Sequence, residues 1–146
     1  MKSRKRKGAP DWAYYKNPFS KFGMIYADML KSKPYRELSC SARQFLTVCI
    51  AHSSTEIAKE CLYNALDERY RSIGKPKEKI DLNAEVYNND KMLFIFPKKH
   101  YEEYGYTKQY VQKCFKELNE KGFIKTVQIG NVHRVSIYQF SAEWKK

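Results

Sequence analysis

Residues 105–124 constrain the fold more than any other segment of the chain, because they hold one helix and the signals for both of its ends. Gly105 suits the turn before that helix, and Thr107 is a residue type that caps a first turn by accepting a backbone hydrogen bond. Gly122 is typical of a helix C-terminus, and an apolar dipeptide follows it directly. The pattern predicts a helix over 107–121 that leads at once into a β-hairpin.

The predicted helix has two different faces. Its apolar residues fall into a single stripe at helical spacing, which consists of Val111, Cys114, Phe115 and Leu118. The opposite face carries Lys108, Gln109, Gln112, Lys113 and Lys116. A glutamine amide can pair with adenine, a lysine can donate to guanine or to phosphate, and the N-terminal end of the helix dipole favours anions. The same face also suits an ordinary solvated helix, so a binding role depends on the neighbouring elements.

A β-hairpin is expected after the helix, with strands at about 123–129 and 132–140. The dipeptide Gly130-Asn131 between them is suited to a two-residue turn. Several polar side chains stand on the hairpin where a nucleic-acid backbone could meet them: Lys125, Gln128, Asn131, His133 and Arg134. We expect Lys125, Asn131 and Arg134 to contact DNA, but not Gln128 and His133.

The part of the chain before residue 74 is expected to be largely helical. A short helix is predicted at about 22–31, ended by Ser32-Lys33-Pro34 because proline cannot continue it. Ser41 and Gln44 form a capping-box arrangement at the start of residues 41–72. A second capping signal lies inside that segment, so the pattern leaves open whether it is one helix or two. The segment carries four basic and four acidic residues, which favours a scaffold or a partner interface over a DNA surface.

Residues 74–91 are expected to form a mobile loop, since they combine glycine, proline, lysines and an Asn-Asn-Asp run. The compact apolar run 92–96 follows and predicts a short buried strand. Pro97 is well placed at the first position of a helix over 97–104. Residues 11–146 are therefore expected to form one domain with a proper core.

The charge of the chain points to a polyanionic partner. Its 146 residues include 28 Lys and Arg against 16 Asp and Glu, a net charge of +12. Such an excess attracts nucleic acid first. Residues 1–10 form a predicted flexible basic arm, in which Arg4, Lys5 and Arg6 are expected to lie along phosphates or to enter a minor groove. The alternative is a solvated tail without a role.

Other classes of function find less support. The four cysteines have spacings that fit neither a metal site nor a redox pair, so we expect reduced thiols in a cytoplasmic protein without metal or cofactor. We find no apolar run long enough to span a membrane and no signal peptide. Glu102-Glu103 is the only acidic pair beside the basic surface, and adjacent helix residues point about 100° apart, so we expect no enzyme. RNA binding stays open.

The expected order of elements resembles the winged helix-turn-helix fold over roughly residues 38–140. The segment 105–124 is similar to the recognition helix and wing of many bacterial regulators. More narrowly, residues 32–38 with Ser41-Ala42-Arg43, followed later by Phe94-Ile95-Phe96-Pro97, are similar to small proteins of plasmids, phages and conjugative elements. Those include replication initiators and relaxosome accessory factors.

The resemblance implies an α+β, mainly α, winged helix-turn-helix protein with an N-terminal helical extension and a C-terminal hairpin wing. Arg134 and its neighbours would touch the flanking backbone, and the residues that would face the major groove are Thr107, Lys108, Gln109, Gln112 and Lys113. The implied function is non-enzymatic binding of double-stranded DNA, as a homodimer or in a larger nucleoprotein assembly. The implied role is transcription regulation, replication or conjugative transfer of a mobile element. The alternative is a winged-helix module that binds another protein through residues 41–72.

Overall fold

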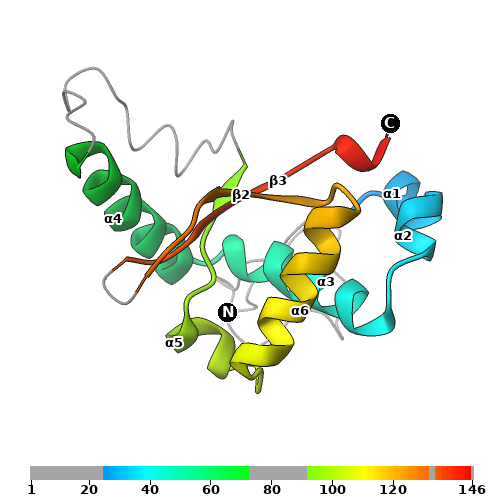
Figure 1. The fold of residues 1–146 in the computed structure, drawn as a ribbon, viewed down its shortest axis with the longest axis horizontal. Helices are drawn as coiled ribbons and strands as arrows, with labels where there is room; N and C mark the ends of the chain where they lie inside the picture. The colour runs from blue at the N-terminus through cyan, green and yellow to red at the C-terminus, as the bar shows by residue number, and fades with distance from the viewer. Residues whose placement is uncertain (1–24, 73–91, 132–133, 146) are drawn as a thin grey trace, which may run out of the picture.

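The chain folds into an α+β structure that is mainly helical and has one small antiparallel sheet (Figure 1). The computed structural model describes residues 25–72, 92–131 and 134–145. Three predicted features lie outside the described residues: the basic arm with Arg4, Lys5 and Arg6, the loop 74–91, and His133.

Two short helices begin the described part of the chain. α1 spans Ala27–Lys31, and α2 spans Lys33–Arg36. The helix predicted at 22–31 therefore ends where expected, but Pro34 then lies in the first turn of another helix. A first turn tolerates proline because its N–H groups have no partner inside the helix. Ser32 is the N-cap of α2, and its side chain accepts a backbone N–H of the first turn.

The segment 41–72 forms two helices, which settles the choice that the pattern leaves open. α3 spans Cys40–Ser53, and α4 spans Glu56–Ser72. Thr55 lies between them, and its Oγ1 accepts the backbone N–H of Ala58 at 3.3 Å. The second capping signal is therefore used, and it starts α4.

The capping box predicted at Ser41 and Gln44 is wrong. The N-cap of α3 is Ser39, whose Oγ accepts the backbone N–H of Ala42 at 3.1 Å. Ser41 lies inside the first turn instead. The two serines are similar caps by local pattern, but they differ in their distant contacts. Glu117 binds both the backbone N–H and the hydroxyl of Ser39, whereas at Ser41 the backbone carbonyl accepts the Tyr110 hydroxyl.

The next three elements are β1, α5 and α6, which span Leu93–Phe94, Lys98–Glu102 and Lys108–Glu120. The strand predicted over 92–96 is thus paired over only two residues. Pro97 is the N-cap of α5 rather than its first helical residue, since its backbone is extended.

Both ends of α6 follow the prediction. Thr107 is the N-cap, and its Oγ1 accepts the backbone N–H of Tyr110 at 3.2 Å. Gly105 before the helix has a φ of +80°, and Gly122 after it has a φ of +83°. These left-handed conformations favour glycine, which explains why the chain turns sharply on both sides of α6.

β2 (Ile124–Gln128) and β3 (Ile137–Phe140) complete the sheet. The strand order is β1-β3-β2, and β3 pairs antiparallel with both neighbours. A short 3₁₀ helix at Glu143–Lys145 follows.

The two-residue turn predicted at Gly130-Asn131 is wrong. The hairpin closes through two backbone hydrogen bonds between Asn131 and Arg134, with N···O distances of 2.8 and 3.4 Å. Gly130 has a different role, because a Cβ at this position would lie 2.6 Å from the backbone nitrogen of Ser136. The two sides of the hairpin approach each other too closely there for a side chain.

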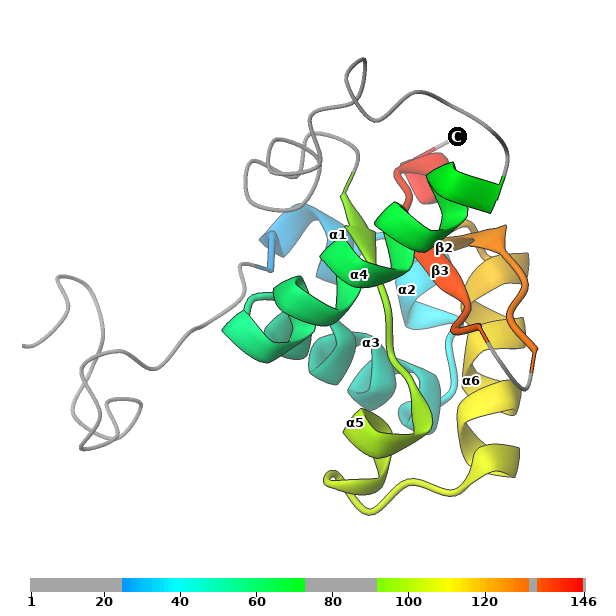
Figure 2. The ribbon, with the colours of Figure 1, turned by 90° about the vertical axis from the view of Figure 1, so that its left-hand side faces the viewer.

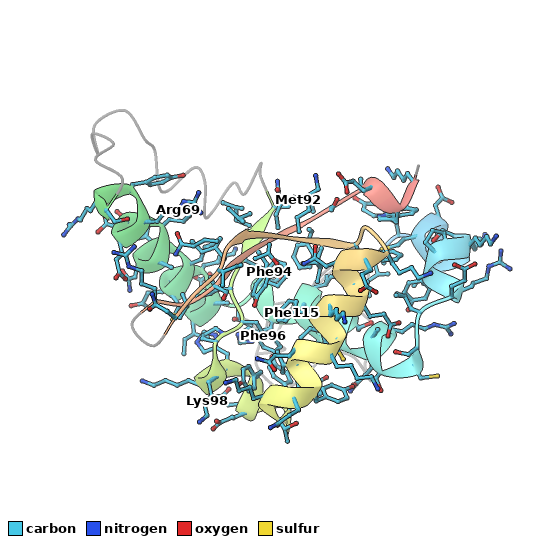
Figure 3. The ribbon with its side chains drawn as sticks, viewed as in Figure 1. Arg69, Met92, Phe94, Phe96, Lys98 and Phe115 are labelled. Carbon is cyan, nitrogen blue, oxygen red and sulfur yellow. The ribbon has the colours of Figure 1, made fainter. Side chains whose placement is uncertain are left out.

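The sheet lies between two helical layers (Figure 2). Leu93 faces α4 and Phe94 faces α3 and α6, as the alternation of side chains along a strand requires. The cluster under α4 consists of Leu62, Ala65, Leu66, Leu93, Ile95 and Ile137. On the other face Phe115 stacks on Tyr138 at a centroid distance of 4.0 Å and packs edge-on against Phe45 at 4.9 Å. Figure 3 shows Phe94 and Phe115 between the sheet and α6.

Candidate nucleic-acid interface

The side of α6 that faces away from the core carries all of the predicted helix contacts. Val111, Cys114, Phe115 and Leu118 are buried, as their spacing predicts. The exposed residues are Thr107, Lys108, Gln109, Gln112, Lys113 and Lys116. Within the described ranges, none of the three lysines forms an ion pair with a carboxylate. Their charges are therefore available to an anionic ligand.

The C-terminal half of α6 is fixed against the start of α3 by Glu117. Its Oε2 accepts the backbone N–H of Ser39 at 2.6 Å, and its Oε1 accepts the Ser39 hydroxyl at 2.8 Å. A carboxylate at a helix N-terminus is also favoured by the helix dipole. Just after α6, Lys121 donates to Glu37 at 3.1 Å, and this hydrogen bond lowers the pKa of the Glu37 carboxyl. These contacts hold the exposed face in one orientation.

The N-terminal half of α6 is held by two tyrosine hydroxyls. Tyr106 and Tyr110 both donate to Oε1 of Gln44, at 3.1 and 3.2 Å, and their rings stack at a centroid distance of 4.9 Å. Burial raises the pKa of Tyr106 to about 12, so its hydroxyl stays a donor at neutral pH. Gln44 therefore links α3 to α6 instead of capping α3.

The three predicted contacts on the hairpin are exposed, but two of them are already paired. The Nζ of Lys125 lies 2.6 Å from Oε1 of Glu143, and the Nε of Arg134 lies 3.5 Å from Oε1 of Glu68. Asn131 Oδ1 accepts the backbone N–H of Arg134 at 3.1 Å. A phosphate contact by either cation would replace an exposed ion pair, which costs only about 0–1 kcal/mol.

α4 supports the hairpin, a role that the sequence does not predict. Nη1 of Arg69 donates to the Val127 carbonyl and to Oε1 of Gln128, both at 3.4 Å, and Glu68 beside it pairs with Arg134. No local pattern signals these contacts, because Arg69 and Val127 are 58 residues apart in the sequence.

α6 and the hairpin lie along the same side of the molecule. Both run down the right-hand edge of Figure 2, whereas α4 begins on the opposite side. A single flat or grooved ligand could therefore touch the exposed face of α6 and the hairpin together.

α5 adds two lysines that are not among the predicted contacts. Lys98 and Lys99 are exposed in its first turn, and Lys98 extends away from the core in Figure 3. Lys98 Nζ lies 3.6 Å from Glu102 Oε1. The sequence signal for them is their place directly after Pro97, in the first turn of the helix that precedes α6.

No family model matches the chain, and no curated protein or solved structure shows significant similarity to it. Among the described residues, no three or more His, Cys, Asp or Glu side chains form a group that could hold a metal ion. In the same ranges, no helix combines the length and the apolar character needed to cross a membrane. The function is therefore proposed from the geometry of the surface and from the resemblance in the sequence.

Proposed function

We propose that this chain is a cytoplasmic, non-enzymatic protein that binds double-stranded DNA through a winged helix-turn-helix fold. α6 is the recognition helix, α5 is the helix before it, and the β2–β3 hairpin is the wing. The order α3, α4, β1, α5, α6, β2, β3 supports this assignment, since it agrees with the order of elements along the chain on which the resemblance rests. α1 and α2 form the N-terminal extension.

The observation that carries the proposal is the exposed face of α6. It presents two glutamines and three lysines, and the lysines are unpaired within the described ranges. Contacts with α3 hold both ends of this face in place. An α-helix with side chains is about 10–12 Å wide and fits a major groove of about 12 Å. Gln109 and Gln112 are one turn apart, so their amides can reach successive base edges. The lysines would then contact phosphates or guanines.

The proposed site is small. One helix reads few base pairs, so specific binding requires a homodimer or a larger nucleoprotein assembly. We propose a role as a regulator or accessory factor in replication or conjugative transfer of a mobile element. This role depends on the similarity of residues 32–38 and 94–97 to small proteins of such elements.

Fluorescence anisotropy with labelled duplexes of mixed sequence tests the proposal. We expect binding that weakens with salt, with a slope of roughly −5 in log affinity against log salt for about six phosphate contacts. The triple variant K108A/K113A/K116A should reduce that slope by about 3 and weaken binding at least about tenfold. Lys113→Ala and Lys59→Ala, which each remove one positive charge, form a matched pair beside the triple variant. Lys59 belongs to the first half of α4, and that half lies on the side opposite α6 in Figure 2, so Lys59→Ala should change binding less than Lys113→Ala does.

Two results would contradict the proposal. One is a folded protein that binds no duplex at low salt, which would leave the protein-interaction module and RNA binding as the remaining interpretations. The other is a triple variant that binds as tightly as the parent chain, which would mean that DNA contacts another surface.

A further inference from the structure

Four side chains form a continuous hydrogen-bonded chain that joins α3, α4 and α5. Nδ1 of His52 lies 2.8 Å from the Tyr104 hydroxyl, and Nε2 of His52 lies 2.9 Å from Nδ1 of His100. Nε2 of His100 in turn lies 3.6 Å from Sγ of Cys61. Both imidazoles are buried, with 4% and 6% of their surface exposed, whereas Tyr104 is 42% exposed in the turn before α6. The core between these helices therefore contains a polar pathway.

The geometry does not suit a metal ion. The two nitrogens of His100 point to different partners, one to His52 and the other to Cys61. A single metal can take only one nitrogen of a ring, so these three side chains do not converge on one point. The arrangement is that of a hydrogen-bonded chain.

The chain is fully satisfied when both imidazoles are neutral. Each neutral ring has one donor and one acceptor nitrogen, so hydrogen bonds can run in one direction from Tyr104 to Cys61, or in the reverse direction. One added proton places a positive charge in the core. A second added proton makes both rings donors at every nitrogen, so two N–H groups would face each other across the 2.9 Å contact between His52 and His100.

The surroundings provide little compensation for such a charge. Among the described residues, no carboxylate hydrogen-bonds to either ring. Burial, with the neighbouring His100, lowers the pKa of His52 to about 4, and burial also lowers the pKa of His100, with partial compensation from Glu103. Glu103, just after α5, is the carboxylate that acts on His100. At the two ends of the chain of side chains, Glu103 and Cys49 act on Tyr104, and Glu60 and Lys99 act on Cys61.

We propose that the His52–His100 pair is a proton-sensitive lock that ties α5 and the turn before α6 to α3. While both rings are neutral, the pair holds α5 in place through His100 and the turn through Tyr104. When the pair takes up protons, the contact opens and these two segments separate from α3. The lock acts at the N-terminal end of α6, because Gly105 directly follows Tyr104 and the N-cap Thr107 is only two residues further on.

The direction of the effect follows from linkage. In the opened state the imidazoles are hydrated and have the ordinary pKa of about 6.5, whereas in the closed state they resist protonation. Opening is therefore favoured as the pH falls below that value. The opening equilibrium should rise up to about tenfold per pH unit for each proton taken up. A consequence for DNA affinity rests on the proposed function, but the opening itself does not.

Imidazole ¹⁵N NMR of the full chain tests the lock without DNA. The chain has three histidines, and the variants H52Q, H100Q and H133Q assign their resonances. At neutral pH we expect the rings of His52 and His100 each to show one protonated and one unprotonated nitrogen. Between pH 7.5 and 5, hydrogen-exchange protection of the α5 amides and of residues 104–110 should fall. The fall should be up to about tenfold per pH unit for each proton taken up. The protection of the α4 amides should fall less over the same range.

The H52Q/H100Q double variant is the control for a merely structural role of the two histidines. The histidine titration is measured on the parent chain, so that part of the test does not depend on whether a variant folds. In the double variant the α5 amides should lose the pH dependence and keep a constant protection. The proposal is overturned if His52 and His100 titrate near 6.5 with α5 unaffected, or if α5 opens equally with pH in the double variant. Failure of duplex binding would leave these readouts unchanged, so it would count against the proposed function only.

Discussion

Gly105 and Gly122 have nearly the same backbone conformation, but their surroundings differ. Both lie at the left-handed φ that a side chain disfavours. Around Gly105 there is open space, whereas a Cβ on Gly122 would lie 2.9 Å from the backbone nitrogen of Trp144. The two residues therefore separate the conformational cost of a side chain from the cost of a steric clash.

We predict that Gly105→Ala lowers the free energy of unfolding by about 1 kcal/mol and Gly122→Ala lowers it by about 3 kcal/mol. Gly105→Ala lowers the free energy of unfolding only because alanine disfavours the left-handed backbone conformation. The second also forces the end of α6 away from the 3₁₀ helix that contains Trp144. Urea unfolding at neutral pH measures both, with Gly105→Ala as the matched control. Equal losses would mean that the close approach to Trp144 does not matter.

In the proposed complex with DNA, α6 is the element in which base specificity and general affinity for DNA can be separated. Its exposed face mixes amides, which can read base edges, with lysines, which can neutralise phosphates. Its buried stripe and its contacts to α3 involve neither set. Substitutions on the exposed face should therefore change binding without changing the fold.

Gln109→Ala should relax the preference for one base pair by about 1–3 kcal/mol, because an amide that pairs with adenine discriminates by roughly that amount. Lys113→Ala should instead weaken binding to all sequences alike and reduce the salt slope by about 1. A selection from random duplexes, followed by anisotropy on the selected site and its single-base variants, distinguishes the two. If Gln109→Ala weakens all sequences equally, the side chain contacts the backbone.

At the scale of the whole molecule, the buried histidines make stability depend on pH. The unfolded chain protonates His52 at the ordinary pKa of about 6.5, but the folded chain does so only at about 4. Because the folded pKa is depressed, the unfolded state binds more protons between these values, and stability is lost as the pH falls.

We predict that the free energy of unfolding drops by about 2 kcal/mol between pH 7 and pH 5 because of His52. Urea titrations at half-unit pH steps measure the drop. His52→Gln should have lower stability at neutral pH but a much flatter pH profile over this range. A variant with the parent's profile would assign the pH dependence to other groups.

Local sequence signals predict α6 closely, because a helix depends on neighbours three and four residues away. Thr107, the stripe from Val111 to Leu118, and the two flanking glycines all lie within that reach. Local signals are weaker where two similar residues compete, as at Ser39 and Ser41. They also misplace the hairpin turn, since Gly130 is required by the close approach of Ser136 and not by the turn itself.

The amino-acid sequence by itself determined the succession of strand, two helices and hairpin after residue 91, the two faces of α6 and the excess of positive charge. Only the tertiary structure decided which charges stay unpaired and which polar groups meet in the core. Glu68 and Glu143 neutralise Arg134 and Lys125 while the α6 lysines stay unpaired within the described ranges, and His52 meets His100 from 48 residues away. Such contacts depend on how the layers pack, which brings together residues that no local pattern relates.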